Sequence, residues 1–416
     1  MEMTGKKGIY RWVVLAILVL SFTSTFISRF IWAPVLSVAA GDLGFSMTQA
    51  GSLMSAFYFG YLFTQIPGGF LADKFRVKYF LFSCVLGVAI LTFAMSYVQD
   101  YTISYVIRFC GGIMGGGIMA FCSRLLSNYF APQERGIAFG ILLASPSLGS
   151  LIANQVGPQI LAGGGWRDAF QVSAFIIAAI ALLVLVVIHE PKREAVSGAP
   201  KTGFVEGLKN YFTNKQILIL SLAGFLFMSI PAGYITWANK FITAPLPSGA
   251  SLSAMQAGLI VTFYSIFSII GSMSSGFIGK KFKINPKSFI AVIYVLMIAT
   301  LLAFALQRSF TGLLVTSILH GLVSCMSSTH ITYWAVNIGG NKYAATTTSV
   351  QNLLFQSANV ITPIIAGSMI DRQMVDGVAS TYMPVWLLYC GLLAGALIVI
   401  SFASKKSAIA AMGPAK

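Results

Sequence analysis

Long apolar stretches alternate with short polar segments along the whole chain. A helix needs about 20 mostly apolar residues to cross a lipid bilayer, and twelve stretches reach that length. The pattern therefore predicts an all-α membrane protein with twelve transmembrane helices. The predicted helices span residues 11–39, 46–72, 78–98, 101–127, 135–161, 168–189, 216–243, 254–278, 287–306, 311–337, 344–370 and 381–403.

The predicted helices divide into two groups of six. The longest polar segment, residues 190–215, lies near the middle of the chain and is rich in Lys, Gly, Pro and Glu. We therefore predict an N-terminal six-helix bundle at residues 1–189 and a cytoplasmic linker at 190–215. A C-terminal six-helix bundle is predicted at residues 216–416.

The two halves carry an internal repeat. Gln49-Ala50-Gly51 recurs as Gln256-Ala257-Gly258, and the segment 69–76 recurs in related form at 276–283. Both pairs are separated by 207 positions, so the second helix of each half is expected to occupy an equivalent place. Parallel repeats around a midplane site are a known plan of alternating-access transporters.

Composition and charge placement agree with a membrane protein. The chain is 57% hydrophobic and 9% charged, whereas soluble domains are about 25% charged. The net charge of +16 arises mainly from alternate loops, which by the positive-inside rule places both termini and the linker in the cytoplasm. We expect a multi-pass protein of the cell membrane, with the lipid bilayer and not nucleic acid as its partner. These loops hold Lys6, Lys7, Arg11, Lys74, Arg76, Lys78, Lys192, Arg193, Lys201, Lys209, Lys215, Lys280, Lys281, Lys283, Lys287, Lys342, Lys405, Lys406 and Lys416.

Arg29 and Arg108 are the two formal charges well inside predicted helices. A charged residue at the centre of a membrane helix costs about 2.5–3.5 kcal/mol on insertion scales, and no Asp or Glu lies at comparable depth. The natural partner is an anion that binds and leaves, and a guanidinium suits a carboxylate because it forms two parallel hydrogen bonds. The alternative is structural. Pro34 could free backbone carbonyls for Arg29, and Arg108 lies close to the start of its helix.

Four further polar side chains in the apolar helices are candidates. Asn352 and Gln356 lie one turn apart, so they either bond to each other or orient a solute. His320 and His330 could carry a coupling proton near neutral pH, although the favoured interpretation is that they are hydrogen-bonded polar residues that line their helix. The residues suggest no metal cluster, nucleophile with a base, or cofactor motif, so an enzyme is not expected.

The loop after the second predicted helix resembles a signature of the major facilitator superfamily. The segment 69–78 reads Gly-Phe-Leu-Ala-Asp-Lys-Phe-Arg-Val-Lys. The resemblance implies a major facilitator fold in which Gly69 allows close helix approach and charged residues latch the cytoplasmic side. These latch residues would be Asp73, Lys74, Arg76 and Lys78. Arg76 departs from the family, which usually has Gly there, and the second-half copy has Lys280 in place of the acid.

Further segments are similar to the organic-anion branch called the anion:cation symporter family. This likeness assigns Tyr61, and with it the neighbouring Tyr58, to substrate binding, and it adds Glu134 and Arg135 to the latch. Asn352, Gln356 and Pro363 fall on the helix-eleven pattern of that branch. The matching segments are 55–61, 65–69, 108–109, 128–136 and 165–170.

Two positions depart from that branch. Its first helix usually carries Asp-Arg, where this chain has Ser28-Arg29, and its fourth helix often carries an acid where this chain has Gly115. Proton coupling through a buried carboxylate is therefore disfavoured. Facilitated diffusion, anion exchange, and co-transport with Na⁺ or with a proton all stay open.

We predict a secondary active or facilitative transporter of small organic anions, with carboxylates favoured. Arg29 would hold the anion near the midplane, assisted by Tyr61 and Arg108, while Asn352 and Gln356 would close the site from the second half. Solutes with a phosphate or sulfonate head, including lysolipids, are the alternative cargo, and a non-transporting sensor on this fold is the alternative class. We expect the chain to act as a monomer.

Overall fold

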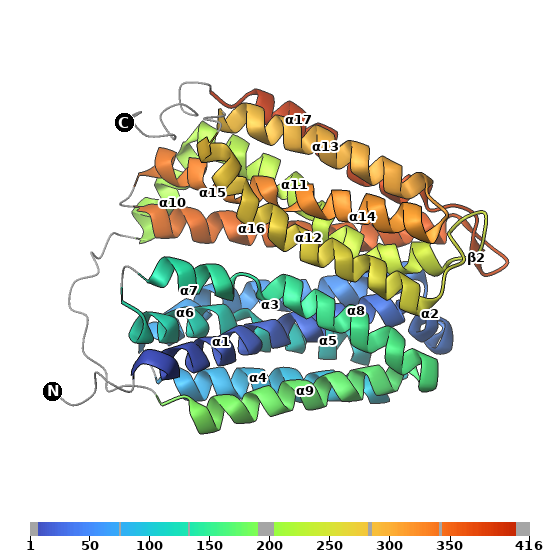
Figure 1. Ribbon diagram of the computed structural model, residues 1–416, viewed down its shortest axis with the longest axis horizontal. Helices are drawn as coiled ribbons and strands as arrows, with labels where there is room; N and C mark the ends of the chain where they lie inside the picture. Colours follow the sequence, from blue (N-terminus) through green and yellow to red (C-terminus); the bar gives the residue numbers. More distant parts are fainter. Residues whose placement is uncertain are drawn as a thin grey trace. The chain divides into compact units, whose positions relative to one another are not determined.

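The computed structural model describes residues 7–74, 76–131, 134–189, 204–281, 285–340 and 343–404, and almost all of them are helical (Figure 1). The chain separates into two compact units, Met1–Ala195 and Val196–Lys416. Unit 1 contains α1 (Lys7–Phe30), α2 (Trp32–Leu43), α3 (Met47–Lys74), α4 (Val77–Ala94), the 3-10 turn η1 (Met95–Tyr97), α5 (Tyr101–Gly116), α6 (Ile118–Tyr129), α7 (Arg135–Leu142), α8 (Ser145–Gly163) and α9 (Trp166–Val187).

Unit 2 repeats this helical plan and adds a short hairpin. Its helices are α10 (Phe204–Thr213), α11 (Lys215–Thr243), α12 (Ala254–Lys281), α13 (Pro286–Leu306), α14 (Phe310–Ser324), α15 (Met326–Gly339), α16 (Ala344–Asp371) and α17 (Met383–Ser401). Strands β1 (Met374–Val375) and β2 (Val378–Ala379) pair antiparallel between α16 and α17.

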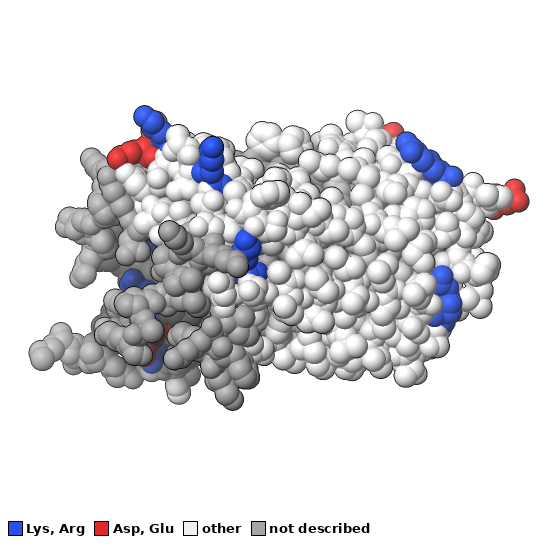
Figure 2. Space-filling view, turned by 90° about the horizontal axis from the view of Figure 1, so that it is seen from above, with Lys and Arg blue, Asp and Glu red and all other residues white. Residues whose placement is uncertain are grey.

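The predicted fold class is confirmed. Eleven segments of the described chain are long and apolar enough to cross a membrane. Helix α3 adds a twelfth long helix with 28 residues, about 42 Å at the usual rise per residue. On the face seen in Figure 2, charged side chains lie toward the two ends, with an uncharged surface between them.

Several predicted helices are interrupted where they were expected to be continuous. The first breaks at Ile31, between α1 and α2, because Pro34 has no N–H to continue the hydrogen-bond ladder. The fourth breaks at Gly117, after a glycine-rich run, and the tenth breaks at Cys325. Such breaks expose backbone carbonyls inside the bundle, and these must find other donors.

Glycines allow α3 and α5 to pack with their backbones in contact. A Cβ added at Gly60 would lie 1.9 Å from the carbonyl oxygen of Phe109, and one at Gly112 would lie 2.1 Å from that of Phe57. The glycine-rich run therefore serves close helix packing. Unit 2 has the same device between α12 and α14, where a Cβ at Gly321 would lie 2.5 Å from the Tyr264 carbonyl oxygen.

Part of the predicted linker is structured. Residues 190–203 lie outside the described residues, but 204–213 form α10, which packs within unit 2. Asn210 donates to the carbonyl of Gly339 at 3.1 Å. The Tyr211 side chain is buried against Ile217 and Val350, and its hydroxyl bonds to Ser221. The amphipathic character of this short helix explains why it packs on the bundle despite its polar sequence.

Three acidic residues form hydrogen bonds near helix ends. Asp100 caps α5 by accepting from the backbone N–H of Ile103 at 2.9 Å, and Asp168 accepts from that of Gly165 at 2.8 Å. Asp42, near the end of α2, accepts from the indole of Trp166 at 2.9 Å and pairs with Arg167. Asp100 and Asp168 thus stabilise helix N-termini, Asp42 joins α2 to α9, and none of the three lies in the middle of the bundle.

Candidate functional site

Arg29 lies in the last turn of α1, next to the break at Ile31, and only 1% of it is exposed. Four aromatic rings surround its guanidinium carbon. The ring centroids lie at 4.9 Å for Phe26, 5.1 Å for Phe57, 4.3 Å for Tyr58 and 4.7 Å for Tyr61. Aromatic faces attract a cation at such distances. We call these four residues around Arg29 the aromatic cage.

One edge of the guanidinium, which we call the open edge, has no hydrogen-bond partner. Nε and Nη2 of Arg29 are buried, and neither has a hydrogen-bond partner. These two nitrogens carry the parallel N–H bonds that bind both oxygens of a carboxylate. The guanidinium also interacts with the Tyr58 hydroxyl. Buried donors without partners are costly and rare in folded proteins, so this edge is a candidate anion-binding group.

Arg108 is buried nearby but is engaged differently. From α5, its Nη1 donates to the carbonyl of Ser28 at 2.7 Å, and its Nη2 donates to that of Arg29 at 2.9 Å. Its Nε donates to the carbonyl of Leu53 at 3.2 Å. The structural role considered for Arg29, donation to carbonyls at a helix break, is thus performed by Arg108. The structure brings together Arg29, Tyr58 and Tyr61 but directs the Arg108 donors to backbone.

The two positions where the resembling branch carries acids are filled by local packing. The Ser28 hydroxyl accepts from Thr92 on α4 at 2.7 Å. A Cβ added at Gly115 would lie 2.7 Å from Cγ2 of Thr25 and 3.6 Å from Cζ of Phe57. An acidic side chain at 115 would therefore require the Thr25 side chain to move.

Unit 2 carries an aromatic cluster around His320. Tyr234 stacks on Tyr264 with centroids 4.3 Å apart, and both rings lie within 6 Å of the imidazole centroid, at 5.2 and 5.8 Å. Nδ1 of His320 bonds to the Thr300 hydroxyl at 3.0 Å, while Nε2 has no partner. The Tyr234 hydroxyl bonds to Ser317 at 2.7 Å.

The other second-half candidates are dispersed. Asn352 is exposed, whereas Gln356 is half-buried and accepts from the Asn359 amide at 2.9 Å. The two amides at 352 and 356 do not satisfy each other in the contacts seen. His330 stacks on Phe289 with centroids 4.5 Å apart, so it lies in a different environment from His320.

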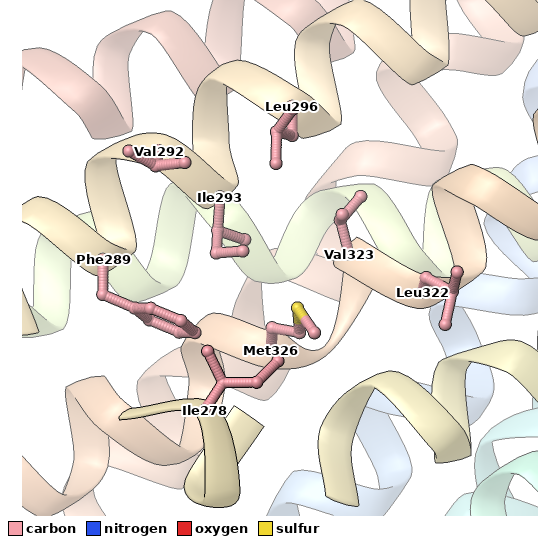
Figure 3. Close-up of a pocket in the computed structure, with 8 residues that line it drawn as sticks. All are labelled: Ile278, Phe289, Val292, Ile293, Leu296, Leu322, Val323 and Met326. Carbon is pink, nitrogen blue, oxygen red and sulfur yellow. The ribbon is translucent and has the colours of Figure 1, made fainter. Parts of the chain in front are cut away.

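A pocket of about 420 Å³ opens in unit 2 between α12, α13, α14 and α15 (Figure 3). Every lining residue is apolar, so the pocket offers no donor for an anion. The lining consists of Ile278, Phe289, Val292, Ile293, Leu296, Leu322, Val323 and Met326.

The predicted latch is described only in part. Gly69, Asp73 and Lys74 lie in α3, but their side chains are outside the described part of the chain, whereas Arg76 is exposed before α4 and Lys78 lies in its first turn. Glu134 pairs with Arg11 at 2.6 Å. Arg135 donates to the carbonyls of Phe130 and Ser127 at 3.1 and 2.8 Å.

Sequence reasoning missed two members of the aromatic cage, Phe26 and Phe57. A signal was available, because Phe26 lies three residues before Arg29 and Phe57 lies four before Tyr61, which places each pair on one helix face. Most aromatic residues at such spacing are packing residues, and only the contact between α1 and α3 distinguishes these two.

The helical plan and the buried arginine define a polytopic membrane protein built for solute passage. A family model of the Major Facilitator Superfamily matches residues 18–363. The chain belongs to this superfamily of transporters, as the resemblance predicted, and it is not an enzyme.

Individual relatives are distant but match over most of their length. The chain is 24% identical to a hexuronate transporter of Bacillus subtilis, with 88% of this chain and 89% of the relative covered. It is 23% identical to a probable sulfoacetate transporter of Cupriavidus necator, covering 87% and 88%. A solved bacterial homologue of the lysosomal transporter Spinster superposes with a TM-score of 0.78 at 18% identity, covering 97% of each chain.

Proposed function

We propose that this protein transports small organic anions with a carboxylate or sulfonate head across the cell membrane by alternating access. The observation that carries the proposal is the open edge of Arg29, a buried pair of parallel donors without a partner. Both relatives named above carry such anions in their descriptions, a hexuronate and sulfoacetate. Both termini would lie in the cytoplasm, by the positive-inside rule.

The aromatic cage favours binding of a small anionic head group over binding of a solute with a long tail. Its four rings hold the guanidinium from several sides, so the side chain is ordered before a solute arrives. A preordered donor pair loses little entropy on binding, which favours affinity for a small ligand. Tyr58 and Tyr61 would contact the bound head group, and Arg108 would hold the backbone of α1. Roles for Asn352 and Gln356 in closing the site, and for the latch residues in gating, stay predictions.

The test is uptake of a labelled hexuronate and of labelled sulfoacetate into proteoliposomes. Arg29→Lys should weaken apparent affinity by about tenfold or more, because an ammonium is a point charge and cannot present two parallel donors. The matched control is Arg372→Lys at the exposed end of α16, for which we expect parental uptake. Parental affinity in the Arg29→Lys protein would refute the assigned binding group.

A sulfonate is retained beside the carboxylate because its oxygens fit the same two donors. Competition separates the two. Inhibition of hexuronate uptake by sulfoacetate, lost together with transport in Arg29→Lys, would indicate a single site for both. A sulfonate that does not compete would restrict the cargo to carboxylates.

A further inference from the structure

We infer that this protein works as an anion exchanger, in which the outward and the return step each carry an anion. The inference rests on the proposed function, since it needs the anion at Arg29. Without a bound anion, the open edge of Arg29 stays buried and unpaired inside unit 1.

Among the described residues, no acidic side chain pairs with Arg29 in place of the anion. The eight acidic residues within the described ranges lie at helix ends or between helices: Asp42, Asp73, Asp100, Glu134, Asp168, Glu206, Asp371 and Asp376. In the described part of the chain, the ion pairs are Arg11–Glu134 and Arg167–Asp42, and neither involves Arg29. A carrier with an acid beside its arginine can neutralise the charge itself when the solute leaves.

Positions 28 and 115 could have supplied such an acid. The Ser28 hydroxyl is bonded to Thr92, and Gly115 is packed against Thr25. Both positions are occupied by tight local contacts. The charge of Arg29 therefore has the cage rings and the Tyr58 hydroxyl as its partners, and these compensate a buried cation only partly.

The unneutralised charge also affects the rate of reorientation. Reorientation must carry Arg29 through an occluded state from which water is excluded, and an uncompensated buried charge is strongly unfavourable there. A bound anion cancels that charge. Loaded carriers should therefore reorient much faster than empty ones, which produces exchange instead of net flux.

The experiment compares proteoliposomes that contain an unlabelled hexuronate with proteoliposomes that contain none. The membrane potential is clamped with K⁺ and valinomycin, so that charge build-up cannot limit net uptake. We expect labelled hexuronate to enter the loaded vesicles at least about tenfold faster. Equal rates, or accumulation in unloaded vesicles driven by an inward proton gradient, would overturn the exchange inference and leave the proposed function intact. Failure of purified protein to bind or move hexuronate and sulfoacetate in either preparation would overturn both.

A charge-restoring variant tests the cause. Thr25 lies one turn before Arg29 on α1, and its hydroxyl is buried without a partner. Thr25→Asp would place an acid at the favourable spacing for an ion pair, and the ratio of exchange to net uptake should fall toward one. Thr25→Asn is the matched control and should keep the parental ratio. If Thr25→Asp does not yield monodisperse protein, Ser28→Asp with Ser28→Asn replaces the pair. An unchanged ratio in a folded acidic variant would refute the charge explanation.

Discussion

Removal of the Arg108 side chain should destabilise unit 1, whereas removal of the Arg29 side chain should not. Arg108 donates to the carbonyls of Leu53, Ser28 and Arg29 at 3.2, 2.7 and 2.9 Å. Two of these carbonyls belong to the last turn before the break at Ile31, where the backbone ladder is interrupted. Arg108→Met would leave them buried without donors.

The magnitude follows from those three bonds. A hydrogen bond to a charged group contributes about 1.5–3 kcal/mol, and part of that sum is offset because the buried guanidinium no longer has to be desolvated. Loss of one partner from a buried charged network costs about 3–5 kcal/mol. For a unit of this size, this corresponds to a fall in Tm of roughly 6–20 °C. The Tm of Arg108→Lys should fall between the Tm of the parent and that of Arg108→Met, because one ammonium cannot reach all three carbonyls.

Arg29→Met provides the contrast. It removes a charge whose Nε and Nη2 have no partner, and it also removes the contacts with the cage rings. These terms oppose each other, so we expect a Tm within about 3 °C of the parent. Binding of the labelled hexuronate should nevertheless be lost.

The assay is thermal unfolding of detergent-purified protein followed by size-exclusion chromatography, paired with equilibrium binding on the folded fraction. Folded Arg108→Lys protein should keep the parental Kd within about threefold. The reasoning is refuted if Arg108→Met unfolds at the parental temperature. It is also refuted if Arg108→Lys loses affinity as severely as Arg29→Lys at an unchanged Tm, since Arg108 would then be a binding residue.

Three further changes have defined outcomes. Gly112→Ala should lower Tm and transport together, because its Cβ would lie 2.1 Å from the Phe57 carbonyl oxygen, whereas Gly140→Ala has nothing within 4 Å and should behave as the parent in the same uptake and unfolding assays. Asp42→Asn weakens a partly exposed ion pair and should leave the Tm close to that of the parent, because such pairs contribute little to stability, so a clear fall in Tm would contradict its surface role. His320→Gln should retain anion exchange at every pH tested. If the parent shows proton-driven accumulation and His320→Gln loses it, the coupling proton would be assigned to this histidine.

The fold class was predictable because membrane helices can be identified in a sequence by their length and hydropathy. Every helix of the described chain from α1 to α9 lies within or beside a predicted span. The missed element was α10, whose polar sequence is typical of a linker. Its burial depends on contacts such as that of Tyr211 with Ser221, which join residues ten apart around a turn. Such contacts leave no periodic signal in an apolar stretch.

The two arginines at the centre of the candidate site were predictable from the sequence, but their different roles were not. A lone arginine deep in an apolar helix indicates function, and this identifies Arg29 and Arg108 equally. Their roles differ because of the position of the helix break. The carbonyls freed near Ile31 accept hydrogen bonds from Arg108, which lies on α5. The sequence contains Pro34, which indicates a break, but not which neighbouring helix supplies the donors.

The break at Ile31 links the two arginines. Arg108 donates to the backbone carbonyl of Arg29 itself at 2.9 Å, so the charge on α5 fixes the main chain from which the open guanidinium extends. A side chain anchored at its backbone and enclosed by the cage rings has few alternative positions, and preordered donors of this kind bind with less entropic cost. The cost of two buried cations in one six-helix unit is then understandable. One is satisfied by carbonyl dipoles and stabilises the fold, and the other is left unsatisfied at a fixed place. If a solute anion is what neutralises the second cation, binding and conformational change depend on the same unpaired edge.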